Sequence, residues 1–560
     1  MALPKTIATD VLIVGGGPVG LALANELGMR GISAVLIEQH DRVGSQPRAK
    51  TTNVRSMEHM RRWGIADRIR EESPLPRGYP TDIYFLTRMF GHELAHIENA
   101  FNGAQTRDPR YSEHAQWIPQ YVVEAVLKER LAVWPSIRTL FATRLDGFTQ
   151  FPAGIEARAV NLEDNAPVTI SAQYLVGADG ARSMVRELIG ARLEGQHRLA
   201  NHYNMVIRIP EFAAYPPSRQ GIMYWLVNPE APAVLAPMDK GSTWSFGLTL
   251  KPGMTEMPDD EAGRRVWQAV GREISFEVVA RDYWSAHRLI ANRYRDERVF
   301  LAGDACHLHP PFGGYGMNMG IGDAVDLGWK LAATLQGWGG PGLLDSYETE
   351  RRPVHIRVLD ESVQNYSVLS QHLVRDDLEV DSEAGVAARQ AVSEAIIGSK
   401  TREFKSLGIV LGSHYSGSPI IVDDGTDAPD NTVTTYSPSA HPGCLAPHHW
   451  LDDQTSLYDR FGKSFTLIQT DVADVKTVER LTAAAADVGV PLRVLDLQRA
   501  GLRDLYGANF VLVRPDQHVA WRGDRLHFDA AQLFDRVRGA DAAALVAQSG
   551  GERGLEAAGS

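Results

Sequence analysis

Residues 303–324, GDACHLHPPFGGYGMNMGIGDA, bring side chains of several chemical types into one short stretch. Asp304, Cys306, His307 and His309 could ligate a metal ion, the glycines that follow could let a backbone approach a nucleotide, or the whole stretch could be a buried loop. The two histidines lie two positions apart, and no further Cys, His or acidic residues follow at a recognisable ligand spacing. We therefore predict no metal site, and we expect Cys306 to be a small buried residue.

The elements around this stretch place Asp304 at a strand end. The apolar run from Val299 to Ala302 predicts a strand that ends directly before Gly303-Asp304, and a long helix is expected to begin near Gly316. The segment QYLVGADGARSMVRELIG repeats this order, with Asp179 after a strand and a helix beginning near Ser183. Ligands of open α/β sheets bind at the carboxyl ends of strands. Asp179 could therefore contact a ligand, or it could cap the helix that follows it.

A third signature opens the chain. The sequence predicts a strand from Val11 to Val14, a helix from about Pro18 to Arg30 and a second strand from Ala34 to Ile37, which together form a βαβ unit. The turn after the first strand has the pattern G-x-G-x-x-G at Gly15, Gly17 and Gly20. Glycines at these positions allow a tight turn, a close approach to a pyrophosphate and tight packing of helix on strand.

Glu38 ends the second predicted strand, 18 residues after Gly20. An acid at this position can accept hydrogen bonds from the ribose of an adenine dinucleotide and disfavours a 2'-phosphate. The helix start supplies N–H groups and the positive end of a dipole for the phosphates. The βαβ unit therefore indicates dinucleotide binding, and it leaves NAD and FAD as alternatives.

Taken in order, the three signatures resemble those of flavin-dependent aromatic monooxygenases of the para-hydroxybenzoate hydroxylase and phenol hydroxylase type. The matching segments are GGGPVG with Glu38, GADGARS and GDACHLHPPFGGYGMN, and also PRAKTTNVRSMEHMRRWGI, IPQYVVEAVL and LLDSYETERRPV. They cover about residues 8–360. The resemblance implies bound FAD, with NADPH or NADH as a transient co-substrate, because the chain has no second complete dinucleotide fingerprint.

The resemblance also implies roles for individual residues. Asp304 would bind the ribityl chain, the backbone from Gly314 to Asn318 would surround the pyrimidine end of the flavin, and Arg48 would lie near the pyrophosphate and the nicotinamide dinucleotide. The full set of expected FAD contacts is Gly15, Gly17, Pro18, Val19, Gly20, Glu38, Gln39, Arg48, Gln120, Asp179, Asp304, Pro311, Gly314, Gly316, Met317 and Asn318.

By this resemblance the enzyme hydroxylates a phenolic ring through a flavin C4a-hydroperoxide, and O2 is consumed. Such chemistry requires that water is excluded and that the phenolate is favoured. Candidate catalytic residues are Lys50, His202, Tyr224 and Pro311, and candidate substrate contacts are Met223, Trp225, Phe312 and Tyr315. Which face of each strand points inward stays open, because a slip of one residue reverses it.

Several alternatives remain, both for individual residues and for the function. Lys50 could be a solvated lysine or a phosphate contact, and Tyr315, where many relatives have Gln, could pack beneath its own loop. Arg208, Arg281 and Arg288 could each bind a substrate carboxylate. A flavin-dependent halogenase shares the FAD fold, but its W-x-W-x-I-P motif is absent. A non-catalytic FAD-binding protein is the other alternative.

The predicted fold class is α/β, with a Rossmann-like FAD-binding domain, an interleaved antiparallel-sheet substrate domain and a C-terminal thioredoxin-like domain. The last of these has no C-x-x-C motif, so we expect no dithiol chemistry there. The expected boundaries are 1–80, 115–190 and 285–370 for FAD binding, 81–114 and 191–284 for the substrate, 371–418 for a helical connection and 419–560 for the thioredoxin-like domain.

Composition excludes several other classes of function. The net charge of -12 and the absence of a Lys/Arg block argue against nucleic acid as a partner. Two cysteines exclude a disulfide framework and indicate a cytoplasmic protein. The apolar N-terminal run of about 15 residues is shorter than a bilayer span and lacks the flanks of a signal peptide, so no membrane association is expected. The expected partners are a small aromatic substrate and O2, and a homodimer stays open.

Overall fold

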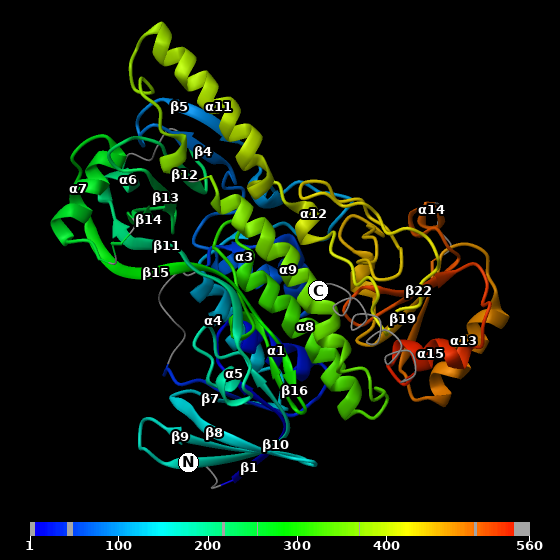
Figure 1. Ribbon diagram of the computed structural model, residues 1–560. Coiled ribbons are helices and arrows are strands. Elements are labelled where there is room, and N and C mark those ends of the chain that lie inside the picture. The colour runs from blue at the N-terminus through cyan, green and yellow to red at the C-terminus, as the bar shows by residue number, and fades with distance from the viewer. Residues whose placement is uncertain are drawn as a thin grey trace, which may run out of the picture.

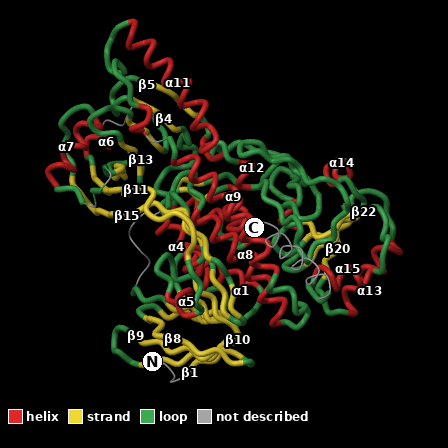
Figure 2. Tube along the Cα trace, viewed as in Figure 1, coloured by secondary structure: helices red, strands yellow, loops and turns green. Residues whose placement is uncertain are grey.

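The computed structural model describes residues 6–41, 49–214, 219–251, 253–254, 256–368, 370–497 and 501–541. Two large sheets lie at the two ends of a group of long central helices, and a smaller α/β unit lies to one side of these helices (Figures 1 and 2). This arrangement confirms the predicted α/β fold class. Among the described residues, no helix combines the length and apolar character needed to cross a bilayer.

The first sheet contains the N-terminal βαβ unit. Its path is β16-β17-β10-β1-β2-β7, and β8 and β9 extend it beside β10. β1 is parallel to β10 and β2, and β10 is parallel to β17, so the carboxyl ends of these strands meet at one edge. The bounds are β1 Thr6–Val14, β2 Ala34–Ile37, β7 Ile137–Leu140, β8 Thr143–Phe151, β9 Gly154–Asn161, β10 Pro167–Gly177, β16 Arg295–Asp296 and β17 Val299–Leu301.

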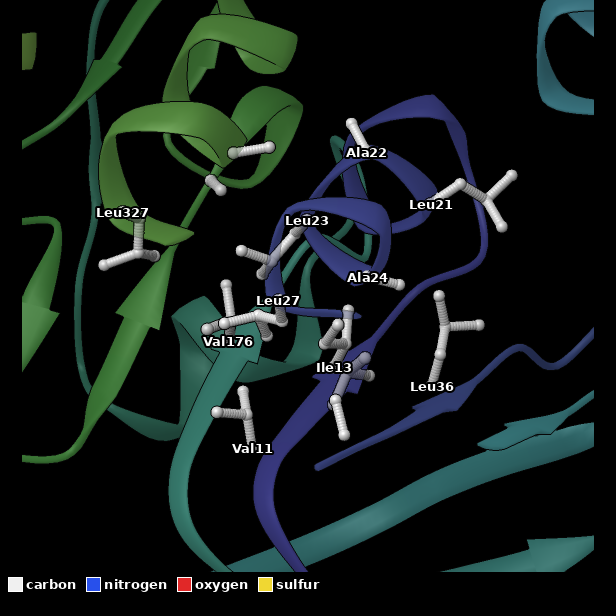
Figure 3. Close-up of a cluster of buried hydrophobic side chains, with 14 of the residues drawn as sticks. Val11, Ile13, Leu21, Ala22, Leu23, Ala24, Leu27, Leu36, Val176 and Leu327 are labelled. Atoms are coloured by element: carbon white, nitrogen blue, oxygen red, sulfur yellow. The ribbon is translucent and has the colours of Figure 1, made fainter. Parts of the chain in front are cut away.

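Helix α1 (Pro18–Met29) packs on this sheet between α4 and α8. Its apolar side chains meet those of β1, β2, β10 and α8 in the cluster drawn in Figure 3, which includes Val11, Ile13, Leu21, Leu23, Leu27, Leu36, Val176 and Leu327. The other helices of this part are α2 Val54–Arg62, α3 Ala66–Glu72, α4 Gln120–Leu131, α5 Met184–Leu188, α8 Gly316–Leu335 and α9 Ser346–Tyr366.

The second sheet has the order β18-β15-β11-β14-β13-β12-β4-β5 and is mostly antiparallel, with one parallel pair between β12 and β4. Its bounds are β4 Ile83–Leu86, β5 Glu93–Ile97, β11 Leu193–Arg208, β12 Met223–Leu226, β13 Ala233–Pro237, β14 Thr243–Thr249, β15 Glu277–Ala291 and β18 His307–Leu308. Because β17 belongs to the first sheet and β18 to the second, the chain passes from one sheet to the other at Asp304.

Short elements complete these two layers. The small helices α6 Pro210–Ala214 and α7 Asp259–Val270 pack beside the second sheet, and the two-stranded pair β3 Thr51–Thr52 and β6 Gln116–Trp117 lies apart from both sheets. Helices α10 Ser370–Leu373, α11 Glu383–Phe404 and α12 Leu407–Val410 follow α9. α11 lies against β5 (Figure 1), and its Phe404 packs in the same apolar cluster as Phe85 and Trp225 of the second sheet.

The C-terminal unit is a small α/β unit built on a four-stranded sheet. Its sheet is β20-β19-β21-β22, in which β19 is parallel to β20 and antiparallel to β21. Both cysteines of the chain are buried and unpaired. The bounds are β19 Phe465–Gln469, α13 Val475–Asp487, β20 Leu492–Asp496, α14 Leu502–Tyr506, β21 Phe510–Val513, β22 Val519–Gly523 and α15 Ala530–Val537.

Candidate functional site

The turn between β1 and α1 is closely packed on two sides and open on a third. Gly15 has a left-handed φ of +111°, and a Cβ atom there would lie 2.3 Å from the carbonyl oxygen of Ala178. A Cβ at Gly20 would lie 2.0 Å from the carbonyl oxygen of Gly15, whereas one at Gly17 would meet nothing within 4 Å. No side chain caps α1. The N–H groups of its first turn therefore face room for an anionic phosphate group.

Glu38 lies against this turn. One carboxylate oxygen accepts a hydrogen bond from the backbone N–H of Gly16 at 2.7 Å, and the other accepts one from the N–H of His40 at 2.9 Å. The acid is thus held at the end of β2 beside the glycine turn, where the sequence predicts contact with a ribose. The neighbouring Gln39 is exposed.

The Val19 side chain, at the start of α1, packs against Gly303 and Gly320 of the segment that contains Asp304. A Cβ at Gly303 would lie 2.8 Å from Cγ2 of Val19, and a Cβ at Gly320 would lie 2.5 Å from the same atom. Only glycine at these two positions lets the start of α1, the strand end before Asp304 and the first turns of α8 come together around Val19. Asp304 itself is exposed at this junction.

The carboxylate of Asp179 serves the start of α5. Its Oδ1 accepts a hydrogen bond from the Ser183 hydroxyl at 2.5 Å, and its Oδ2 accepts one from the N–H of Val185 at 3.1 Å. Burial raises the pKa of this carboxyl. The geometry therefore supports the capping alternative for the side chain. The backbone of Asp179 stays close to the nucleotide turn, because its Cα lies 3.0 Å from the position of a Cβ at Gly15.

The loop before α8 is held by the Asn318 side chain. Its amide nitrogen donates to the carbonyl oxygens of Thr51 at 2.9 Å and Gly314 at 2.7 Å, and its amide oxygen accepts from the N–H of Asn53 at 2.9 Å. Gly314 has a left-handed φ of +66°. A Cβ at Gly316, the first residue of α8, would meet nothing within 4 Å, and no side chain caps the helix. The start of α8 is therefore rigid and open.

These features fit FAD as the group that the site would hold. The two uncapped helix starts offer N–H groups for the pyrophosphate and for the flavin C2 oxygen, and Glu38 offers a ribose acceptor. Asp304 lies between the two helix starts, where the ribityl chain would pass. Met317 is buried within the first turn of α8, and Pro311 is exposed at the mouth of the loop.

An aromatic wall faces the glycine loop before α8, and its rings are those of His202, Trp225, Trp284 and Phe312. His202 of β11 stacks on Trp284 of β15 with ring centroids 4.2 Å apart, and its ring lies 6.2 Å from that of Phe312. His202 Nδ1 is 3.3 Å from the Thr249 hydroxyl, and Nε2 has no hydrogen-bond partner among the described residues. Burial lowers the pKa of His202 to about 4, so its ring is neutral at physiological pH. A neutral imidazole can exchange a hydrogen bond with a substrate hydroxyl but is a weak base.

β12 shows which strand face points toward Phe312. Met223 and Trp225 lie on the side of the Phe312 ring, and the Trp225 and Phe312 ring centroids are 6.5 Å apart. The indole N–H of Trp225 donates to the Met223 sulfur at 3.1 Å. These residues, predicted as substrate contacts, therefore lie together with His202 and Phe312.

Tyr224 points to the opposite face, so its assignment as a catalytic residue is wrong. Its ring packs in the core of the second sheet beside Trp244. Its hydroxyl donates to the carbonyl oxygen of Arg219 at 2.6 Å and accepts from the N–H of Gly221 at 2.9 Å. Burial raises the pKa of this phenol, and both of its hydrogen-bonding roles are already filled. Successive side chains of a strand point to opposite faces, so Tyr224 points away from the face that carries Met223 and Trp225.

Tyr315 packs beneath the glycine loop, so its assignment as a substrate contact is also wrong. The side chain is 1% exposed and packs against Met319 and Ile409. A Cβ at Gly313 would lie 2.3 Å from its ring. Burial raises the pKa of its hydroxyl. Tyr315 supports the loop from below, which is the alternative that the sequence left open.

Lys50 is half-buried and directly precedes Thr51, which contacts Gly314 in the glycine loop before α8 (the flavin loop). A Cβ at Gly314 would lie 3.0 Å from Thr51 Cβ. Burial lowers the pKa of Lys50 to about 8, and no charged neighbour is among the causes. Gln120 lies next to this segment, because its backbone N–H donates a hydrogen bond to the carbonyl oxygen of Ala49. Its side-chain amide donates to Glu124. Arg48 lies outside the described residues.

The three arginines considered as carboxylate clamps are all engaged at the surface. Arg208 pairs with Glu277, Arg281 with Asp259 and Arg288 with Asp360, and each pair is partly exposed. Each guanidinium therefore already has a carboxylate partner, and the clamp role stays an untested alternative.

The histidines after Asp304 belong to a buried polar network. Nε2 of His307 lies 2.8 Å from Asp323 Oδ2, and Asp323 Oδ1 lies 2.8 Å from His355 Nε2 and 2.9 Å from Arg351 Nε. Asp323 also accepts from the N–H of Gly303 at 3.1 Å. Possible ligand atoms of Cys306, His307 and Asp323 lie within 4.8 Å of one another. Arg351 pairs with the carboxylate of Asp323, and Asp323 in turn holds the backbone turn that carries Asp304. The expectation that no metal binds here stays a prediction.

Sequence reasoning missed three residues of this region. Asp323 lies on α8 and positions the Gly303 turn, Trp284 forms one face of the aromatic wall, and Lys400 of α11 contacts that wall. The alternating pattern of β15 could have suggested Trp284. Nothing in the sequence indicates Lys400, since a lysine on a helix is normally exposed.

Comparisons with known proteins agree with this geometry. A family model described as an FAD binding domain matches residues 8–362, and a model described as the C-terminal region of aromatic-ring hydroxylases matches residues 439–540.

Similar proteins match along nearly the whole chain. An FAD-dependent monooxygenase of Emericella nidulans is 31% identical over 95% of this chain and 90% of its own length. A phenol 2-monooxygenase of Pseudomonas sp. (strain EST1001) is 29% identical over 96% of this chain and 93% of its own length. The solved structure of the rebeccamycin biosynthetic enzyme RebC with reduced flavin has a TM-score of 0.88 and 37% identity, covering 96% of this chain and all of that one.

Proposed function

Because this chain belongs to the family of FAD-dependent aromatic-ring hydroxylases, we propose that its substrate is a phenol whose ring lies between the glycine loop before α8 and the aromatic wall of the second sheet. The observation that carries this proposal is the meeting of His202, Trp225 and Phe312 beside the open helix start at Gly316. FAD, when bound, accepts a hydride from NAD(P)H and activates O2 for transfer of one oxygen atom.

The wall residues would bind the ring and exclude water. His202 and Trp284 present stacked faces, and Phe312 closes the side nearest the glycine loop. Apolar and aromatic surfaces at this place keep water from the reacting atoms, which prevents loss of oxidising equivalents as hydrogen peroxide. Nε2 of His202 is the polar atom that would orient the phenol hydroxyl, since it is buried and has no hydrogen-bond partner among the described residues.

Lys50 would stabilise the phenolate. Its pKa of about 8 allows a large protonated fraction at neutral pH, and its position next to Thr51 places it beside the flavin loop. A protonated amine near the hydroxyl lowers the pKa of a bound phenol, which raises the nucleophilicity of the ring. Pro311, exposed at the loop mouth, would border the ring on the substrate side.

The test is a screen of phenols with the FAD-loaded protein. We expect at least one phenol to accelerate NAD(P)H oxidation and to yield a product heavier by one oxygen atom. A His202→Ala variant should lose most of this acceleration, whereas Tyr224→Phe, which lies outside the wall, should keep it. A halogenated product, or no acceleration by any phenol, would contradict the proposal.

We also propose a cytoplasmic location and a homodimer. The location is supported by two cysteines that are both buried and unpaired, as expected in a reducing compartment. The oligomeric state would be tested by light scattering coupled to size-exclusion chromatography, and a monomer at micromolar concentration would contradict the dimer.

A further inference from the structure

Helix α11 carries a buried lysine into the aromatic wall. Lys400 is 1% exposed. Its ammonium nitrogen lies 4.2 Å from the centroid of the Trp225 ring and 5.6 Å from that of Phe312. Both rings belong to the set of residues that would hold the substrate. A fully buried ammonium over two such rings is unusual, because most lysine side chains are exposed to solvent.

Two hydrogen bonds fix the position of this ammonium. It donates to Glu403 Oε2 at 2.7 Å and to the carbonyl oxygen of Asn365 at 3.0 Å. An ammonium group has three N–H donors, so one donor remains after these two bonds. The two rings lie close enough to receive it, and an aromatic face attracts a cation.

The same ion pair reaches the flavin loop. The Glu403 carboxylate, which is 3% exposed, also lies near the backbone N–H of Gly313, which favours the charged form of the carboxylate and opposes the rise of its pKa by burial. The last turns of α11 therefore contact both the glycine loop, through Glu403, and the substrate wall, through Lys400. The segment expected to be only a connection thus contributes to the candidate active site.

We infer that Lys400 is a positioning residue of the substrate wall, whose ammonium, held against Trp225 and Phe312, stabilises the ionised hydroxyl of the bound ring. This inference rests on the proposed function. Glu403 and Asn365 hold the cation at the wall, and Trp225 and Phe312 hold the ring beside it. The cation then favours the phenolate over the neutral phenol through its charge.

The inference is tested with 4-nitrophenol, whose ionisation can be followed by absorbance, bound to the FAD-loaded full-length protein. We expect its pKa to fall on binding to the wild type. In Lys400→Met the pKa of the bound probe should be higher by about one unit, and the affinity for the phenolate about tenfold lower. Lys400→Arg should restore most of the shift. Equal pKa values for wild type and Lys400→Met, or no binding of the probe to the wild type, would overturn the inference.

Further variants separate this role from a structural one. Lys400→Met leaves Glu403 buried without its partner, so the double variant Lys400→Met/Glu403→Gln provides a neutral pair of similar shape. Lys476→Met, on the exposed side of α13, is the matched control and should leave the probe unaffected. FAD content and circular dichroism verify folding. If no phenol stimulates NAD(P)H oxidation by the wild type, the proposed function fails, whereas equal stimulation and equal probe pKa in wild type and Lys400→Met refute only the role of Lys400.

Discussion

Replacing Arg514 by Met should strongly destabilise the protein, although Arg514 lies far along the chain from the nucleotide signatures. The residue follows β21 in the C-terminal unit, and its guanidinium is fully buried. It lies 2.5 Å from Glu350 Oε1, 2.6 Å from Asp516 Oδ2 and 3.2 Å from Asp326 Oδ1. Glu350 and Asp326 come from α9 and α8, so one arginine joins the C-terminal unit to the two helices that follow the flavin loop.

The magnitude follows from the charges that the variant would leave unpaired. Three carboxylates surround Arg514 and Lys330, and Lys330 contacts Asp326 at 2.8 Å and Glu350 at 2.6 Å. Burial works to raise the pKa of Glu350, but Arg514 and Lys330 outweigh it and hold that pKa at about 2. Without Arg514, buried carboxylates must take up protons or remain charged without a partner. Breaking such a pair costs about 3–5 kcal/mol, which for a chain of 560 residues corresponds to a fall in Tm of about 3–4 °C.

The assay is thermal unfolding of the FAD-loaded protein, with Arg208→Met as the matched control. Arg208 also pairs with a carboxylate, Glu277, but both side chains are about half exposed. Its loss should cost less than about 1 kcal/mol and lower Tm by about 1 °C or less. The double variant Arg514→Met/Glu350→Gln should regain part of the stability, because it removes one of the unpaired charges. Equal falls in Tm for Arg514→Met and Arg208→Met would refute the reasoning.

Three further predictions follow from the site. Gly316→Val should leave Tm of the FAD-free protein unchanged but weaken FAD binding at least tenfold, because the added atoms enter open space at the start of α8. Fluorescence titration with FAD measures this, with Gly398→Val, at another open helical position, as the control. Lys50→Met should remove the loss of kcat/KM that we expect in the wild type as pH rises through about 8, where the lysine loses its proton; the same alkaline limb in both proteins would contradict this role. Burial raises the pKa of Asp326 to about 7, above its ordinary value of 3.8, so its neutral form stabilises the fold below about pH 4 and this contribution is lost as pH rises through 7. Asp326→Asn should therefore show a smaller decrease in Tm between pH 4 and 7 than the wild type, and identical pH dependence of Tm would count against the assignment.

The nucleotide half of the site could be predicted from the sequence because backbone geometry determines it. Gly15, Gly20 and Gly303 are required by contacts at distances where a Cβ would clash, and such requirements leave glycines at fixed spacings in the sequence. Strand β2 and the start of α8 were likewise found at their observed residues, since apolar runs next to glycine turns are local signals. Roles that depend only on the local backbone are therefore readable without a structure.

The substrate half could not be predicted in the same way, because it depends on register and on contacts between distant segments. Tyr224 and Trp225 are adjacent and both aromatic, yet the pleat of β12 places one in the core and the other at the wall. Lys400 reaches that wall only because α11 folds back over β5, and Arg514 reaches α8 and α9 only because the C-terminal unit docks there. If specificity among phenols depends on these contacts, changes in α11 should alter substrate choice while the glycine signatures and FAD binding remain intact. The two halves of the site can then vary separately, because local backbone requirements constrain one half and long-range packing constrains the other.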